Sequence, residues 1–113
     1  GWANYLAPLV MGSSHPDEFI AELSGSFCST DPLIAKTFAE ATFLSDYRAT
    51  LKHIKQPSLV LQSEHDALAA SSVGEFVANE IPNSTLQVIS AHGHCIHMTH
   101  PETVGRSIID FVS

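Results

Sequence analysis

The sequence predicts an α/β fold in which a helical first half is followed by two strand–helix units. Before Gln56 the apolar residues recur at helical spacing, and no segment has a convincing strand pattern. After Pro57 short apolar runs alternate with helical patterns, and such runs are typical of strands covered on both faces. Strands that alternate with helices lie parallel and are joined by right-handed crossovers. We therefore expect a helical segment over residues 1–56 and a β-α-β-α segment over residues 57–113.

The helical half is expected to hold four helices. They are predicted over residues 1–11, over residues 17–23, from Asp31 to Ser45, and in a short segment that Asp46 caps. The third has the clearest start, because the Asp31 carboxylate can cap free N–H groups and Pro32 fits the first helical position. Its apolar side chains recur at helical spacing, namely Ile34, Phe38, Ala41 and Leu44. The stretch 11–16 between the first two helices is predicted to be a loop.

Two strands and two helices are expected after Pro57. The strands are predicted over residues 58–62 and 85–90. Ser71 or Ser72 is expected to cap the helix between them, and the last helix is expected to begin at Pro101. Their buried faces are predicted to carry Val73, Phe76, Val77 and Ile81 in the first helix and Val104, Ile108, Phe111 and Val112 in the second. Two strands alone make a poor sheet, because each strand needs neighbours. This half is therefore expected to be the edge of a wider sheet.

The composition excludes several functional classes. Of the 113 residues, 12 are acidic and 5 are basic, which gives a formal net charge of −7. Such a chain can neutralise few phosphates, so no nucleic-acid partner is expected. Hydrophobic residues make up 44% and charged residues 15%, which favours a folded chain over a disordered one. No apolar run approaches the roughly 18 residues that a membrane-spanning helix needs, so no membrane partner is expected.

The cysteines and the first residues of the chain indicate the cellular compartment in which the protein is expected. Cys28 and Cys95 are too few for a disulfide-stapled scaffold and lie in no C-x-x-C pair, so we expect reduced thiols in a cytoplasmic protein. The chain begins at Gly1 without a cationic segment or a cleavage pattern, so no signal peptide is expected. The absence of an initiator methionine suggests that the first residue results from a cut, in a gene or in a protein.

Ionisable residues follow both predicted strands. Asp66 comes after the first strand and His94 after the second. The carboxyl ends of parallel strands meet at one edge of a sheet, so these two side chains are expected near each other, where ligands bind. A carboxylate that orients an imidazole base requires this placement, and Gly93 would let the backbone turn sharply before the histidine. Spacing alone leaves open a chance pairing of two loop residues.

Four segments resemble one family. Residues 57–66 (PSLVLQSEHD) and 93–101 (GHCIHMTHP) look like the C-terminal part of an α/β-hydrolase, while residues 27–32 (FCSTDP) and 43–48 (FLSDYR) resemble the helical lid of its RsbQ type. Proteins of this type are bacterial stress-response regulators related to plant karrikin and strigolactone receptors. The resemblance covers essentially all of the chain. It implies a lid over residues 1–56, followed by the last two parallel β-α units of the sheet.

The resemblance also implies a function. Asp66 matches the acid and His94 the base of a Ser–Asp–His triad, but no serine of the chain stands in the G-x-S-x-G pattern that carries the nucleophile. The chain alone is therefore expected to be inactive, with its nucleophile and oxyanion-hole loop on an upstream segment. The expected ligand is a small apolar ester or lactone. No cofactor is expected, and a signalling role would involve a partner phosphatase.

Several residues have a structural as well as a functional interpretation. Trp2, Phe27 and Phe43 belong either to a helical core or to an apolar substrate pocket under the lid, whereas Phe38 is expected in the core. The loop that holds His92, His94, His97 and His100 could suggest zinc, but it lacks a regular ligand spacing, so no metal is expected. Cys95 is expected to be a small buried residue rather than a nucleophile.

A second function class stays open. The chain could be a non-catalytic module that associates with itself, with another subunit or with the N-terminal remainder of a hydrolase, and so completes its sheet. An upstream reading frame with G-x-S-x-G would favour the enzyme. Start and stop codons at the bounds of this stretch would favour the module.

Overall fold

The computed structural model describes residues 2–12 and 17–113 and has the α/β architecture that the sequence predicts. Its elements are α1 (Trp2–Met11), α2 (Asp17–Ser29), α3 (Pro32–Leu44), the 3₁₀ helix η1 (Arg48–His53), β1 (Ser58–His65), α4 (Ser71–Glu80), β2 (Ser84–His92), α5 (Ile96–Thr99) and α6 (Pro101–Val112). The predicted loop at 11–16 falls mostly on residues 13–16, outside the described residues. None of the described helices is long and apolar enough to cross a bilayer.

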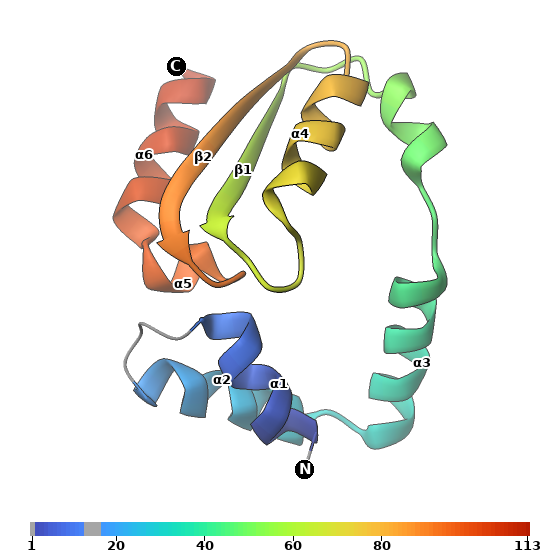
Figure 1. The fold of residues 1–113 in the computed structure, drawn as a ribbon, viewed down its shortest axis with the longest axis vertical. Coiled ribbons are helices and arrows are strands. Elements are labelled where there is room, and N and C mark those ends of the chain that lie inside the picture. Colours follow the sequence, from blue (N-terminus) through green and yellow to red (C-terminus); the bar gives the residue numbers. More distant parts are fainter. Residues whose placement is uncertain (1, 13–16) are drawn as a thin grey trace.

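The two strands form one parallel sheet (Figure 1). Ser58 pairs with Ser84, and the register continues evenly as far as Ser63 opposite Ile89. Figure 1 shows α4 and α6 on opposite sides of the strand pair, and the carboxyl ends of both strands point towards α1 and α2. The register then shifts, so that His65 pairs with His92. Such an irregularity at the end of a strand re-aims the side chains that follow it.

Two apolar clusters hold the fold together. The first packs β2, α5 and α6 against β1 and consists of Ile89, Ala91, Ile96 and Val104, with Leu61 against them. The second joins the helical half to the loop after β2 and consists of Val10, Met11 and Cys95, with Leu6, Phe19, Ile20, Leu23 and Met98 around them. The apolar side chains of α2 thus pack beside the residue that follows His94.

The start of α3 is as predicted. Asp31 is its N-cap, and the carboxylate oxygen Oδ1 accepts the N–H groups of Leu33 and Ile34 at 2.9 and 3.3 Å. The predicted cap of α4 is wrong. The cap position of α4 is Ala70, without a side-chain hydrogen bond, because the Ser71 hydroxyl instead donates to the Glu64 carbonyl across the loop. The N-cap position of η1 is Tyr47, but Asp46 Oδ1 accepts the N–H of Arg48, the first residue of η1, at 3.1 Å, and the carboxylate also pairs with the Arg48 guanidinium at 2.7 Å.

Several elements are longer than predicted. Helix α2 continues to Ser29 rather than ending at Leu23, and β1 extends to His65 rather than to Gln62. These extensions contain polar residues that interrupt the apolar periodicity. The apolar pattern therefore ends before the helix or the strand itself ends. In β1 the extra length comes from ladder pairing with β2, which the side-chain pattern does not encode.

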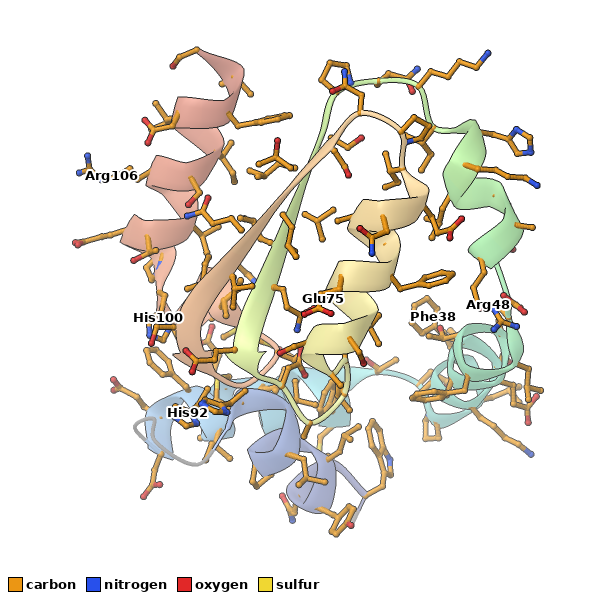
Figure 2. The ribbon with its side chains drawn as sticks, turned by 45° about the horizontal axis from the view of Figure 1, so that its top comes forward. Phe38, Arg48, Glu75, His92, His100 and Arg106 are labelled. Carbon is orange, nitrogen blue, oxygen red and sulfur yellow. The ribbon has the colours of Figure 1, made fainter. Side chains whose placement is uncertain are left out.

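Three predicted core faces are largely exposed in this chain. Phe38 is 72% exposed, contrary to its expected place in the core, and it lies on α3 away from both strands (Figure 2). Helix α6 buries Val104 and Ser107 but leaves Ile108 and Val112 exposed. Similarly, α4 buries Gly74 rather than Val73 or Phe76. For α4 and α6 the cause is geometric, because a two-stranded sheet offers each helix only a narrow surface.

Candidate active site

The structure brings Asp66 and His94 together at the carboxyl ends of the strands. The Asp66 Oδ2 atom lies 2.8 Å from the His94 Nδ1 atom. The carboxylate side chain is only 5% exposed, whereas the imidazole is 48% exposed. Because an ionised carboxylate can only accept hydrogen bonds, a neutral His94 ring carries its proton on Nδ1. Its Nε2 atom then keeps a free lone pair that can accept a proton.

The Asp66 carboxylate is fixed on its other side by the backbone. Its Oδ1 atom accepts the N–H groups of Leu68 and Ala69 at 2.8 and 3.1 Å. Burial by itself raises the pKa of Asp66, but the hydrogen bond with His94 and these two backbone bonds outweigh it, so the pKa lies below the ordinary value. The acid is therefore ionised and held in one orientation.

The lowered pKa of Asp66 predicts a pH dependence of stability. A carboxyl group whose pKa is lower in the folded state stabilises the fold above its unfolded pKa of 3.8 and loses that contribution as the pH falls through the folded value. We expect Asp66→Asn to flatten the fall of the thermal midpoint with pH in this acid range. The measurement is thermal unfolding followed by circular dichroism between about pH 6 and pH 2. Identical slopes for the variant and the parent would contradict the prediction.

The backbone of His94 is anchored to the helical half. Its N–H group donates to the Val10 carbonyl in the last turn of α1 at 2.6 Å, and the N–H of Gly93 donates to the His65 carbonyl at 2.6 Å. Gly93 has a φ of +102°, and an added Cβ atom there would fall onto the Met11 carbonyl group. Only glycine allows this approach, which confirms the expected sharp turn before the histidine.

Replacing Gly93 with alanine is expected to destabilise the protein. The left-handed backbone is strained for alanine by about 1–3 kcal/mol, and the collision with the Met11 carbonyl adds to this cost. The free energy of unfolding, measured by urea denaturation, should fall accordingly. Gly105→Ala is the matched control, because nothing lies within 4 Å of its added Cβ atom. In the interior of α6 this control should stabilise the protein by about 0.5–1 kcal/mol. Equal losses in both variants would contradict the role of Gly93.

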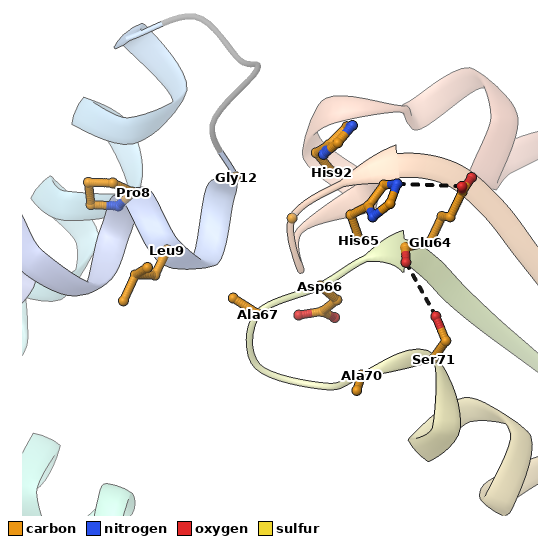
Figure 3. A pocket seen from close by; sticks show the side chains of 11 residues that line it. Pro8, Leu9, Gly12, Glu64, His65, Asp66, Ala67, Ala70, Ser71 and His92 are labelled. Carbon is orange, nitrogen blue, oxygen red and sulfur yellow. Dashed lines mark hydrogen bonds and ion pairs between the residues drawn. The ribbon is translucent and has the colours of Figure 1, made fainter.

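A hollow of about 580 Å³ opens beside the acid (Figure 3). It lies between α1 and the loops that follow the strands, and its lining consists of Pro8, Leu9, Gly12, Glu64, His65, Asp66, Ala67, Ala70, Ser71, His92 and Gly93. The rings of His65 and His92 stack at 4.4 Å, and His65 Nε2 lies 3.4 Å from the Glu64 carboxylate. No sequence pattern predicts this stack, because it depends on the shifted strand register.

The three aromatic pocket candidates are not brought together. The rings of Trp2 and Phe27 pack at 5.3 Å between centroids, so these two side chains share one cluster of α1 and α2. Phe43 lies near the end of α3 and is 76% exposed. None of the three lines the hollow beside Asp66. Their role in a substrate pocket stays a prediction.

Cys95 follows His94 in the chain but is not part of the hydrogen-bonded pair. Cys95 is buried, and burial, followed by the charge of Asp66, raises the pKa of its thiol. As expected, it is a small packed residue, since a reactive cysteine needs an exposed thiolate. Cys28 is also a free thiol. Within residues 2–12 and 17–113, no three His, Cys, Asp or Glu side chains are grouped so that they could hold a metal ion.

Known proteins with similar sequences and structures include hydrolases and receptors, whereas no family model matches the chain. A hydrolase from Oleispira antarctica is 58% identical, with a TM-score of 0.95 over 99% of this chain and 41% of its own. The karrikin insensitive 2 receptor CA of Petunia hybrida is 30% identical over 104 residues, which are 91% of this chain and 38% of the receptor. The chain has the fold of the C-terminal part of an α/β-hydrolase.

Two more distant proteins agree with this assignment. The strigolactone esterase D14 of Arabidopsis thaliana is 26% identical over 93% of this chain and 39% of the esterase. An enol-lactonase from Burkholderia xenovorans is 22% identical and shares the fold, with a TM-score of 0.90 over 98% of this chain and 44% of its own. The predicted resemblance to the C-terminal part of α/β-hydrolases is thus confirmed, and the chain spans about two fifths of the length of these proteins. The RsbQ type stays a prediction.

Proposed function

We propose that this chain supplies the acid and the base of a serine hydrolase whose nucleophile lies outside these 113 residues. The observation that carries the proposal is the 2.8 Å contact between the Asp66 carboxylate and the His94 imidazole beyond the strand ends. Asp66 is buried and ionised, and His94 has an exposed side from which it can reach a substrate. This pair matches the orienting and proton-accepting members of a catalytic triad.

In the proposed reaction His94 first accepts the serine proton and then donates it to the leaving group. The serine Oγ atom attacks the ester carbonyl carbon, and its proton passes to Nε2 of His94 while Asp66 stabilises the imidazolium. The imidazolium then gives this proton to the leaving alcohol oxygen as the ester bond breaks, and an acyl-enzyme forms. A water molecule then attacks the acyl carbon and gives a proton to His94, which passes it to the serine Oγ atom as the bond between the acyl group and the serine breaks and the acid product leaves. On its own the chain lacks the attacking group, so we expect it to be inactive.

The proposed substrate is a small apolar ester or lactone. The names of two similar proteins, an esterase and an enol-lactonase, support this class. Trp2 and Phe27 are proposed to contribute apolar surface to the binding pocket from α1 and α2, and Phe43 from α3. The similarity to a karrikin receptor supports a signalling hydrolase of RsbQ type, in which a regulatory phosphatase would be the partner.

The experiment uses the whole protein that contains this chain. A fluorophosphonate probe should label it once, and peptide mass spectrometry should place the label on a serine outside these residues, in a G-x-S-x-G sequence. The protein should also hydrolyse p-nitrophenyl acetate, and the probe should block that activity. A labelled serine within the chain, or hydrolysis that the probe does not block, would overturn the proposal.

A second candidate function is supported by the apolar surface of α3. Phe38, Phe43 and Leu44 are all exposed there, and a surface of this kind needs a covering partner. The corresponding proposal is a non-catalytic module that covers α3 with a second copy of the chain. Sedimentation equilibrium of the 113-residue chain should then give a dimer that dissociates in Phe38→Ser. A monomer at all concentrations would exclude this candidate.

A further inference from the structure

Gln62 is a buried polar residue that the triad proposal does not use. It is the fifth residue of β1, and it is only 5% exposed. Its side-chain Nε2 atom donates to the Ser63 carbonyl and to the Ala69 carbonyl, both at 2.9 Å. Both amide protons are therefore used, as a buried amide requires. The second bond spans the loop between β1 and α4, which is the loop that begins with Asp66.

Helix α4 approaches the Gln62 side chain closely at Gly74. Gly74 faces Gln62, and an added Cβ atom at Gly74 would lie 2.5 Å from the Gln62 Oε1 atom and 3.0 Å from its Cβ and Cγ atoms. A side chain at this position would displace the carboxamide. The helix backbone on one side and the two carbonyl acceptors on the other thus restrict Gln62 to one conformation.

The hydrogen bonds of Gln62 continue to the candidate acid and base. Ala69 is held at both of its backbone polar groups, because its carbonyl accepts from Gln62 and its N–H donates to Asp66 Oδ1 at 3.1 Å. The other oxygen of the same carboxylate contacts His94 at 2.8 Å. A continuous series of hydrogen bonds therefore runs from a buried strand residue through Ala69 and Asp66 to the imidazole.

We propose that Gln62 is a positioning residue for the Asp66 carboxylate and acts through the Ala69 peptide. The proposal rests on the proposed function of Asp66 and His94. Without the amide, the Ala69 carbonyl loses its donor, the loop relaxes, and Oδ1 loses a well-placed N–H group. The carboxylate then orients the imidazole less well. A displacement of about 1 Å can lower a rate by a factor of about 100. Because the imidazole acts in the chemical step, the loss should appear in kcat rather than in KM.

The test is a double-mutant cycle in the whole protein, with p-nitrophenyl acetate as substrate. Gln62→Met, which keeps the length of the side chain but has no donor, should lower kcat by about 10- to 100-fold and leave KM within about three-fold. In an Asp66→Asn background the same change should alter kcat by less than about three-fold, because both residues act on the same imidazole. Gln62→Glu preserves the shape of the side chain. Its kcat is measured in the same two backgrounds in case Gln62→Met does not fold.

A control and the residual activities separate the outcomes. Ser107→Ala removes another buried polar side chain, one that donates to the Thr103 carbonyl within α6, and it should leave kcat unchanged. The positioning role would be overturned if the Gln62 variants lowered kcat equally in the parent protein and in the Asp66→Asn background. It would also be overturned if the fall in kcat only matched a fall in the folded fraction measured by circular dichroism. Full activity of Asp66→Asn alone would instead overturn the proposed function on which this role depends.

Discussion

Replacing His94 with alanine is expected to lower kcat for ester hydrolysis by about 10⁶-fold in the proposed hydrolase. The reason is chemical, because the serine proton then has no acceptor and the leaving alcohol has no donor. Another imidazole could take over this role only if it lay within hydrogen-bond reach of the proton to be removed. The measurement is the initial rate with p-nitrophenyl acetate at saturating substrate, together with the rate of fluorophosphonate labelling, which should fall in parallel.

The matched control for this variant is His97→Ala. His97 lies in α5, three residues after His94, and its side chain is exposed. It should leave kcat within about two-fold, as expected for a surface substitution away from the site. A His94→Ala variant that retained a tenth of the parent activity, with its fold intact by circular dichroism, would show that another group is the base.

Replacing Asp66 with asparagine is expected to lower kcat by about 10⁴-fold. The asparagine amide can donate to the His94 Nδ1 atom, which favours the tautomer whose proton is on Nε2. That tautomer cannot accept the serine proton. The variant also loses the negative charge that stabilises the imidazolium during the reaction. The same kinetic assay measures the loss, and a fall in kcat without a large rise in KM would show that the change acts on the chemical step.

Asp46→Asn provides the control for Asp66→Asn. The hydrogen bond from Arg48 lowers the pKa of Asp46 to about 2, so this carboxylate is also ionised and paired. It lies in the link before η1 and belongs to the helical half, where it is exposed to solvent. Its replacement should leave kcat unchanged. If both variants lost activity equally, the loss of a negative charge rather than the tautomer of His94 would explain the effect.

The sequence predicts the parts of the fold that depend on local patterns. The apolar run that begins β1, the Asp31 cap with Pro32, and the alternation of strand and helix are all local signals, and the structure confirms each of them. The closeness of Asp66 and His94 follows from one further rule, that the ends of neighbouring parallel strands meet at one edge. The candidate site could thus be located before its geometry was known.

Other features depend on contacts that a single sequence does not encode. Gln62 stands inside an apolar strand pattern as an ordinary polar residue, and only the fold shows that Ala69 and Gly74 surround it. The stack of His65 on His92 needs the register shift near the strand ends. The exposure of Phe38 shows the opposite error, since helical periodicity predicts an apolar face without showing which surface covers it.

The approach of α1 to the loop after β2 has a mechanical consequence. Gly12 and Gly93 let the two backbones meet, and the Val10 carbonyl holds the peptide of His94. A hinge that swung α1 outwards would therefore draw the imidazole away from the Asp66 carboxylate. Any opening of the helical half is expected to bend instead at residues 45–47, which are exposed throughout. In this fold α1, with α2 packed beside it, moves together with His94, the proposed base, and only α3 is free to act as a cover.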